Sequence, residues 1–88
     1  MIKETMIVKD EGGICARKAS IFVLAAKKFK SKIQINAKDK TIDAKNILMI
    51  MSMRLTKGTE LTIVAAGPDE EKAVSTLKDL VVSRFGEE

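Results

Sequence analysis

The clearest hydrophobic periodicity lies in the first third of the chain. Ala19, Phe22, Val23 and Ala26 recur at positions i, i+3, i+4 and i+7, a spacing that places side chains on one face of an α-helix. We therefore predict an amphipathic helix over 16–28. A second helical pattern opens at 69–71 with acidic residues, which favour the positive end of a helix dipole. Its inner face is predicted to contain Ala73, Val74, Leu77, Leu80, Val81 and Phe85.

Shorter segments are rich in β-branched residues or alternate between apolar and polar positions, as half-buried strands do. They predict strands over 4–9, 32–36, 41–44 and 60–66. Turn-forming residues separate them: Asp10 to Gly13, Ala37 to Lys40, and Gly67 with Pro68.

The segment 47–55 is too apolar for an ordinary helix that faces solvent on one side. We interpret it as a short helix with Asn46 as its N-cap. Met49, Ile50 and Met53 are expected to fill the core, while the remaining apolar residues reach the surface. Exposed apolar patches mark interaction sites, and methionine suits one that adapts to several partners.

The elements follow the order β-α-β-β-α-β-α, which predicts an α+β fold in two layers. A four-stranded antiparallel sheet would carry three helices on one face. With 88 residues, the chain can bury one core but is too short to divide, so 1–88 is expected to be a single domain.

Composition excludes several classes of function. The net charge is +4 and the pI is about 9.3, but the three phenylalanines offer no ladder for stacking bases, so an acidic protein partner is favoured over nucleic acid. No apolar stretch approaches the ~20 residues that span a bilayer, and Met1-Ile2-Lys3-Glu4 lacks the charged-then-apolar pattern of a secretory signal, so a cytoplasmic protein is expected. One cysteine and no histidine leave no internal disulfide and no His/Cys metal site.

The segment Gly13-Ile14-Cys15-Ala16-Arg17-Lys18-Ala19 resembles the active-site signature of the HPr family, the phosphocarrier domains of the bacterial sugar phosphotransferase system. That signature reads Gly-Leu/Ile-His-Ala-Arg-Pro-Ala. Further segments that begin at Ala44, Lys57 and Gly67 are similar to other family motifs, so the resemblance covers almost the whole chain. It implies the HPr open-faced sandwich.

Three positions depart from the family pattern. Cys15 stands where the family has the histidine that accepts phosphate from enzyme I, and Lys18 stands where it has proline. Asn46 replaces the serine that many relatives phosphorylate for regulation. Neither histidine phosphorylation nor phosphorylation at position 46 can occur in this chain.

Three functions stay open from the sequence. The preferred one is a noncatalytic adaptor that docks on proteins through Ser20, Ile47, Leu48 and Met51, with Arg17 at the centre as the residue for a partner carboxylate or phosphate. The resemblance implies that the partner is an enzyme I-like protein, a permease component or a transcriptional regulator. No cofactor is expected, and the oligomeric state stays open, with a monomer preferred.

The other two functions use the thiol of Cys15. Free amide groups at the start of a helix favour an anion and lower the pKa of a thiol there, so Cys15 is a candidate phosphoryl acceptor in a true phosphocarrier. A thiol redox switch is the weaker alternative, because the chain has no second cysteine to resolve an oxidised thiol. Cys15 is otherwise a tolerated small residue.

Overall fold

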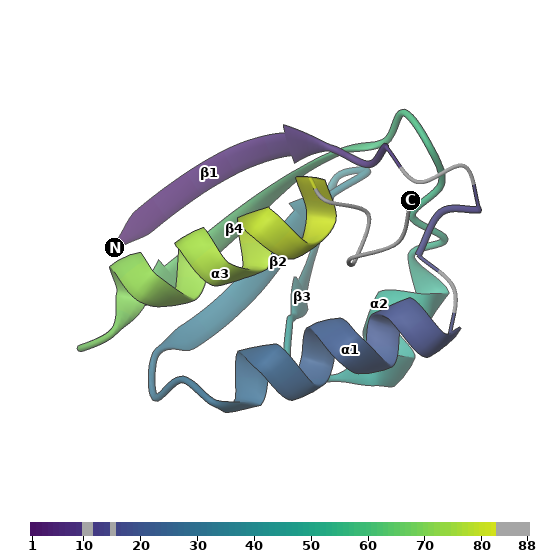
Figure 1. Cartoon of the computed structure of the whole chain (residues 1–88). Coiled ribbons are helices and arrows are strands. Elements are labelled where there is room, and N and C mark those ends of the chain that lie inside the picture. The colour runs from purple at the N-terminus through teal and green to yellow at the C-terminus, as the bar shows by residue number, and fades with distance from the viewer. Residues whose placement is uncertain (10–11, 15, 83–88) are drawn as a thin grey trace.

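The computed structural model describes residues 1–9, 12–14 and 16–82, and the order of its elements is the β-α-β-β-α-β-α predicted from the sequence (Figure 1). The elements are β1 (Ile2–Ile7), α1 (Ala16–Lys27), β2 (Lys32–Ala37), β3 (Lys40–Asp43), α2 (Ile47–Ser52), β4 (Glu60–Ala66) and α3 (Glu70–Val82).

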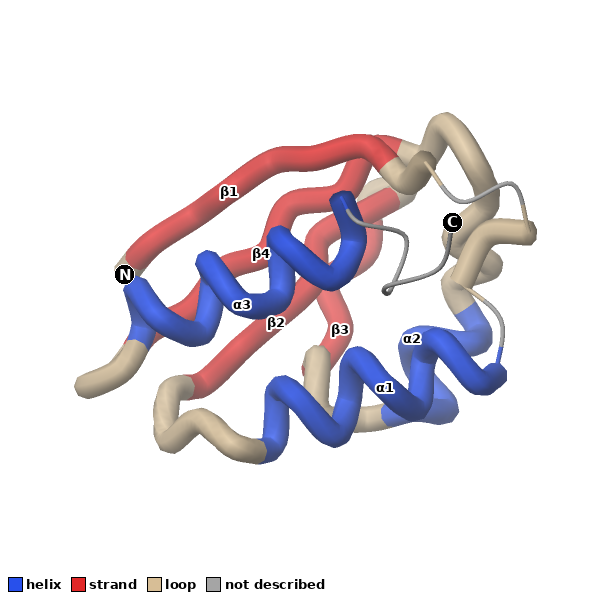
Figure 2. Tube along the Cα trace, viewed as in Figure 1, coloured by secondary structure: helices blue, strands red, loops and turns tan. Residues whose placement is uncertain are grey.

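The four strands form one antiparallel sheet in the order β1-β4-β2-β3. In the centre of the sheet Ile35 pairs with Ile42 on one side and with Ile63 on the other, and all three side chains are buried. Helices α1 and α3 lie across the same face of the sheet (Figure 2), and α2 packs beside α1 and β3. The predicted two-layer sandwich, with its helices on one face, is confirmed.

The predicted inner faces of the two long helices are buried. Ala19, Phe22, Val23 and Ala26 of α1 all lie in the core. On α3 the core residues are Ala73, Val74, Leu77 and Val81, with Leu80 partly buried against them. Phe85, also predicted on this face, lies outside the described residues.

Several boundaries differ from the sequence prediction because of local turns. The first strand runs over Ile2–Ile7 instead of 4–9, and α1 ends at Lys27. Lys38 and Asp39 adopt positive φ values of 51° and 63°, as the two central residues of a tight hairpin do. The turn therefore needs only these two residues, and β3 begins at Lys40 instead of residue 41.

The second helix ends at Ser52, three residues before the predicted end. Arg54 has a φ of 51°, the left-handed conformation that commonly follows a helix C-terminus. The ammonium group of Lys38 donates hydrogen bonds to the carbonyl oxygens of Met53 (3.1 Å) and Arg54 (2.8 Å). These carbonyls at the helix end are thus satisfied by a side chain from the β2–β3 hairpin.

Asp69, just before α3, ties that helix to the loop between α1 and β2. Its carboxylate accepts hydrogen bonds from the backbone amides of Lys30 and Ser31, both at 2.9 Å, and from the Ser31 hydroxyl. The Ser31 hydroxyl, followed by the Lys30 amide, lowers the pKa of Asp69 because these bonds favour the charged form. Ser31 is fully buried, so the carboxylate also satisfies a polar group inside the fold.

The hydrogen bonds to the Asp69 carboxylate predict that part of the folding stability is lost in acid. Because the pKa of Asp69 is lower in the folded protein than in the unfolded chain, its contribution is fully present above the unfolded pKa and is lost as the pH falls through the folded pKa. We expect the free energy of unfolding in urea to fall less between about pH 6 and about pH 2 in Asp69→Asn than in the parent protein. Asp79→Asn removes an exposed carboxylate of α3 as the matched control. An unchanged acid dependence in Asp69→Asn would contradict the assignment.

Gly67, just after β4, permits a close approach to Ser31 in the loop between α1 and β2. Its φ is 153°, and a Cβ atom there would lie 2.6 Å from the Ser31 Cα. Gly58 also has a positive φ, 89°, but faces open space. We expect Gly67→Ala to destabilise the protein by about 2–4 kcal/mol, against about 1 kcal/mol for Gly58→Ala. Urea denaturation of both variants measures the difference, and equal losses would contradict the steric argument.

Candidate functional site

The loop that precedes α1 is anchored on the residues that follow α2. Gly13 has a φ of 68°, and a Cβ atom there would lie 2.6 Å from the Leu55 carbonyl oxygen. The next residue, Ile14, donates its backbone amide to that same oxygen at 2.8 Å. Glycine is therefore required for this contact, which brings the N-terminal end of α1 beside the end of α2. Cys15 lies outside the described residues, so its predicted role stays a prediction.

The first turns of α1 place the predicted site residues on different sides of the helix. Arg17 is exposed and Ser20 is half-buried. Lys18 is only 7% exposed, next to the core residue Ala19. Most of the Lys18 side chain is therefore removed from solvent.

The second helix exposes a cluster of large apolar side chains. Leu48 is 76% exposed, Met49 and Met51 are each 42% exposed, and Ile47 is half-buried. The predicted contact residues Ile47, Leu48 and Met51 thus lie on one short helix that packs against α1. Leu24 of α1 is also 61% exposed. The sequence analysis did not predict this exposed leucine, although Leu24 lies outside the predicted buried face of the helix.

The expectation that Met49 fills the core is wrong, whereas Ile50 and Met53 are buried as expected. Ile50 and Met53 are three positions apart and face the core together. Met49 is displaced from Ile50 by about 100° around the helix axis, which directs it away from that face.

Asn46 caps α2 as the sequence predicts. Its backbone is extended, with φ −114° and ψ 105°, and its side-chain oxygen accepts a hydrogen bond from the Met49 amide at 3.2 Å. The carbonyl of Asn46 accepts from Ile50, which begins the helical bonding. The amide side chain of Asn46 therefore has a structural role as the helix cap.

Charge is distributed unevenly along the chain. No Asp or Glu occurs from residue 12 to residue 38 or from residue 44 to residue 59, the segments that contain α1 and α2. Those segments carry Arg17, Lys18, Lys27, Lys28, Lys30, Lys32, Lys38, Lys45, Arg54 and Lys57. In contrast, α3 opens with Glu70 and Glu71. Basic residues without neighbouring acids in the sequence are therefore concentrated around the first two helices.

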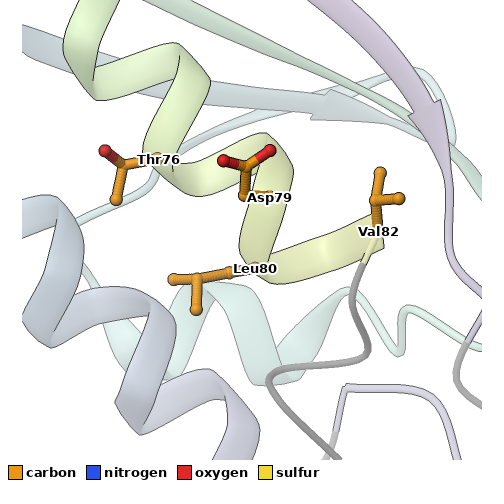
Figure 3. A pocket seen from close by; sticks show the side chains of 4 residues that line it. All are labelled: Thr76, Asp79, Leu80 and Val82. Atoms are coloured by element: carbon orange, nitrogen blue, oxygen red, sulfur yellow. The ribbon is translucent and has the colours of Figure 1, made fainter.

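A pocket on α3 is lined by Thr76, Asp79, Leu80 and Val82 (Figure 3), which include a single carboxylate and no nucleophile paired with a base. Within residues 1–9, 12–14 and 16–82, no three His, Cys, Asp or Glu side chains gather where they could hold a metal ion. None of the helices described there has the length and apolar character to cross a membrane.

Comparisons with known proteins agree with the fold. Residues 2–83 match the family model described as "PTS HPr component phosphorylation site". The chain is 38% identical to the phosphocarrier protein HPr of Treponema pallidum over 88 residues, which cover 100% of both chains.

Two solved structures show how the fold compares in detail. HPr-C-His from Thermoanaerobacter tengcongensis superposes with a TM-score of 0.95 at 41% identity, over 100% of this chain and 99% of that one. The Bacillus subtilis catabolite repression protein Crh, described as a dimer with a swapping domain, gives a TM-score of 0.75 at 34% identity, over 94% and 95% of the two chains.

The cap at position 46 can be tested directly. Asn46→Ala leaves the Met49 amide without its partner and should lower the free energy of unfolding by about 1 kcal/mol. Asn46→Ser retains a capping oxygen and should stay within about 0.5 kcal/mol of the parent protein. Urea denaturation measures both, and a loss in Asn46→Ser equal to that in Asn46→Ala would contradict the capping role.

Proposed function

The chain belongs to the HPr family, and on this premise we propose that it is a noncatalytic adaptor or regulatory protein of the phosphotransferase system. The observation that carries the proposal is the exposed apolar surface of α2, which packs beside α1 in a part of the chain rich in Lys and Arg. The chain has no histidine, so the phosphoryl transfer that the family carries out on histidine is not available to it. Partner binding is the family property that its surface retains. We place this role in the cytoplasm.

The proposed docking surface consists of Arg17, Ser20, Ile47, Leu48 and Met51. Leu48 and Met51 are exposed although they are large and apolar, and burying them against a partner would remove apolar area from water. Asn46 and Lys38 hold the two ends of α2, so the helix would present these residues without first having to fold. A preordered surface lowers the entropic cost of binding.

The charges around this surface indicate the chemistry of the partner. With ten Lys and Arg residues and no acidic residue in the segments that carry α1 and α2, a partner with carboxylates around an apolar centre is favoured. Arg17 is exposed and can form two parallel hydrogen bonds with one carboxylate. An enzyme I-like protein, a permease component or a transcriptional regulator of this character would fit, and its binding should weaken as salt is added.

A phosphocarrier that uses Cys15 as phosphoryl acceptor is the second candidate. The match of residues 2–83 to a phosphorylation-site model, together with Gly13 and Arg17 in the signature positions, favours it. Its weakness is geometric, since a short thiol side chain does not place sulfur where an imidazole nitrogen would lie for in-line transfer. A thiol-based redox switch at Cys15 is a weaker third candidate.

We also propose a monomer. In this fold β1 pairs with β4 of the same chain along its whole length, from Ile2 opposite Ala65 to Ile7 opposite Glu60. The swapped Crh dimer, with a TM-score of 0.75, and an HPr dimer from Thermoanaerobacter tengcongensis, with 0.78, superpose less closely than HPr-C-His from the same organism, with 0.95. Light scattering on the purified protein tests this proposal, and a stable dimer would overturn it.

Purified enzyme I separates the two main candidates. After incubation with phosphoenolpyruvate, Mg²⁺ and enzyme I, the intact mass of the protein should not change, while calorimetry should detect binding. A gain of one phosphoryl group that Cys15→Ala abolishes would instead establish the phosphocarrier. An ordinary HPr serves as the positive control for the activity of enzyme I.

The docking surface is tested by placing a charge in it. Leu48→Asp should weaken binding at least about tenfold, because it puts a carboxylate in the apolar part of the surface. Ile7→Asp makes the same change on β1, where Ile7 is exposed and its neighbour Met6 points into the core, and should alter affinity less than about twofold. Equal effects of the two substitutions would contradict the proposed surface.

A further inference from the structure

The five methionines of the chain fall into two groups that differ sharply in exposure. Met49 and Met51 are each 42% exposed on α2, and Met1 is 76% exposed at the start of the chain. Met6 and Met53 are 6% and 4% exposed and belong to the core. A soluble oxidant therefore reaches the thioethers of the first group while the folded protein shields those of the second.

We propose that Met49 and Met51 are modification sites at which peroxide converts thioethers to sulfoxides and so weakens partner binding at the docking surface. The inference rests on the proposed adaptor function, and it adds a means of regulation that needs no histidine, serine or cysteine. Met51 is part of the docking surface, and Met49 is exposed on the same short helix beside Leu48.

The chemistry is a two-electron oxygen transfer. A lone pair of the methionine sulfur attacks one oxygen of hydrogen peroxide, so that a sulfur–oxygen bond forms, the peroxide oxygen–oxygen bond breaks, and water leaves. Methionine is oxidised to the sulfoxide and peroxide is reduced to water. Methionine sulfoxide reductase reverses the change when two thiols are oxidised to a disulfide and the oxygen leaves as water.

Oxidation at these positions should change the surface without unfolding the protein. Ile50, which anchors α2 in the core, and Met53, at the end of the helix, are both buried. The cap bond from the Met49 amide to Asn46 uses backbone atoms of Met49 and is untouched by oxidation of its sulfur. A sulfoxide instead places a strongly polar group in an apolar contact area, where a partner must desolvate it.

The first arm of the test measures selectivity. Cys15→Ser serves as the parent in all experiments, so that thiol oxidation contributes nothing. After exposure to hydrogen peroxide, peptide mass mapping should find Met49 and Met51 oxidised at least about tenfold faster than Met6 and Met53. Equal rates for the exposed and the buried methionines, with the circular dichroism spectrum unchanged, would overturn the proposal.

The second arm measures binding to purified enzyme I before and after peroxide. Oxidation should reduce the affinity of the parent about tenfold, and methionine sulfoxide reductase with a thiol should restore it. A second protein carries Met49→Leu and Met51→Leu in addition and retains Met1. The ratio of its affinities before and after peroxide should stay near one, whatever its starting affinity.

The outcomes separate this inference from the proposed function. If the untreated parent binds enzyme I and Leu48→Asp weakens that binding, but oxidation of Met49 and Met51 leaves affinity unchanged, the oxidation switch is overturned and the adaptor function stands. If the untreated parent does not bind enzyme I, the switch proposed for this contact is overturned, and so is the adaptor function as docking on enzyme I. An equal loss of affinity in the leucine protein would assign the effect to another residue and would also overturn the proposal.

Discussion

The shortness of α2 is the constraint from which the proposed site follows. Helices α1 and α3 cover one face of a four-stranded sheet, and α2 has only the six residues Ile47–Ser52 between two fixed ends. Fewer than two turns cannot bury a run of apolar side chains on every side. Ile50 takes the position that faces the core, and Leu48, Met49 and Met51 remain at the surface.

Both ends of α2 are held by side-chain hydrogen bonds, one local and one from a distant segment. Asn46 satisfies the Met49 amide at the start, and Lys38 reaches from the β2–β3 hairpin to the carbonyls of Met53 and Arg54 at the end. Just beyond the C-terminal end of α2, the Leu55 carbonyl accepts a hydrogen bond from the backbone amide of Ile14. Because these bonds hold a short helix that has little intrinsic stability, its exposed residues occupy defined positions.

The chain therefore keeps the scaffold of the HPr family while its chemical groups differ. The relatives in these comparisons cover its whole length, yet the chain has no histidine, and the amide of Asn46 caps a helix. A protein without a phosphoryl acceptor can still bind partners, because apolar contact and charge complementarity do not require a phosphoryl acceptor. This separation is the physical basis for preferring an adaptor.

The sequence by itself determined the order of the elements, the inner faces of α1 and α3, and the cap at Asn46, because hydrophobic periodicity and capping chemistry are local properties. It did not determine that Met49 is exposed, that Lys18 is buried, or that α2 ends at Ser52. These features depend on segments that are distant in sequence. The Lys38 side chain meets the end of α2 only through the hairpin, and the concentration of cations around α1 and α2 becomes a surface only when the two helices pack together. Tertiary structure decided them, because which side of a short apolar helix is buried depends on what packs against it.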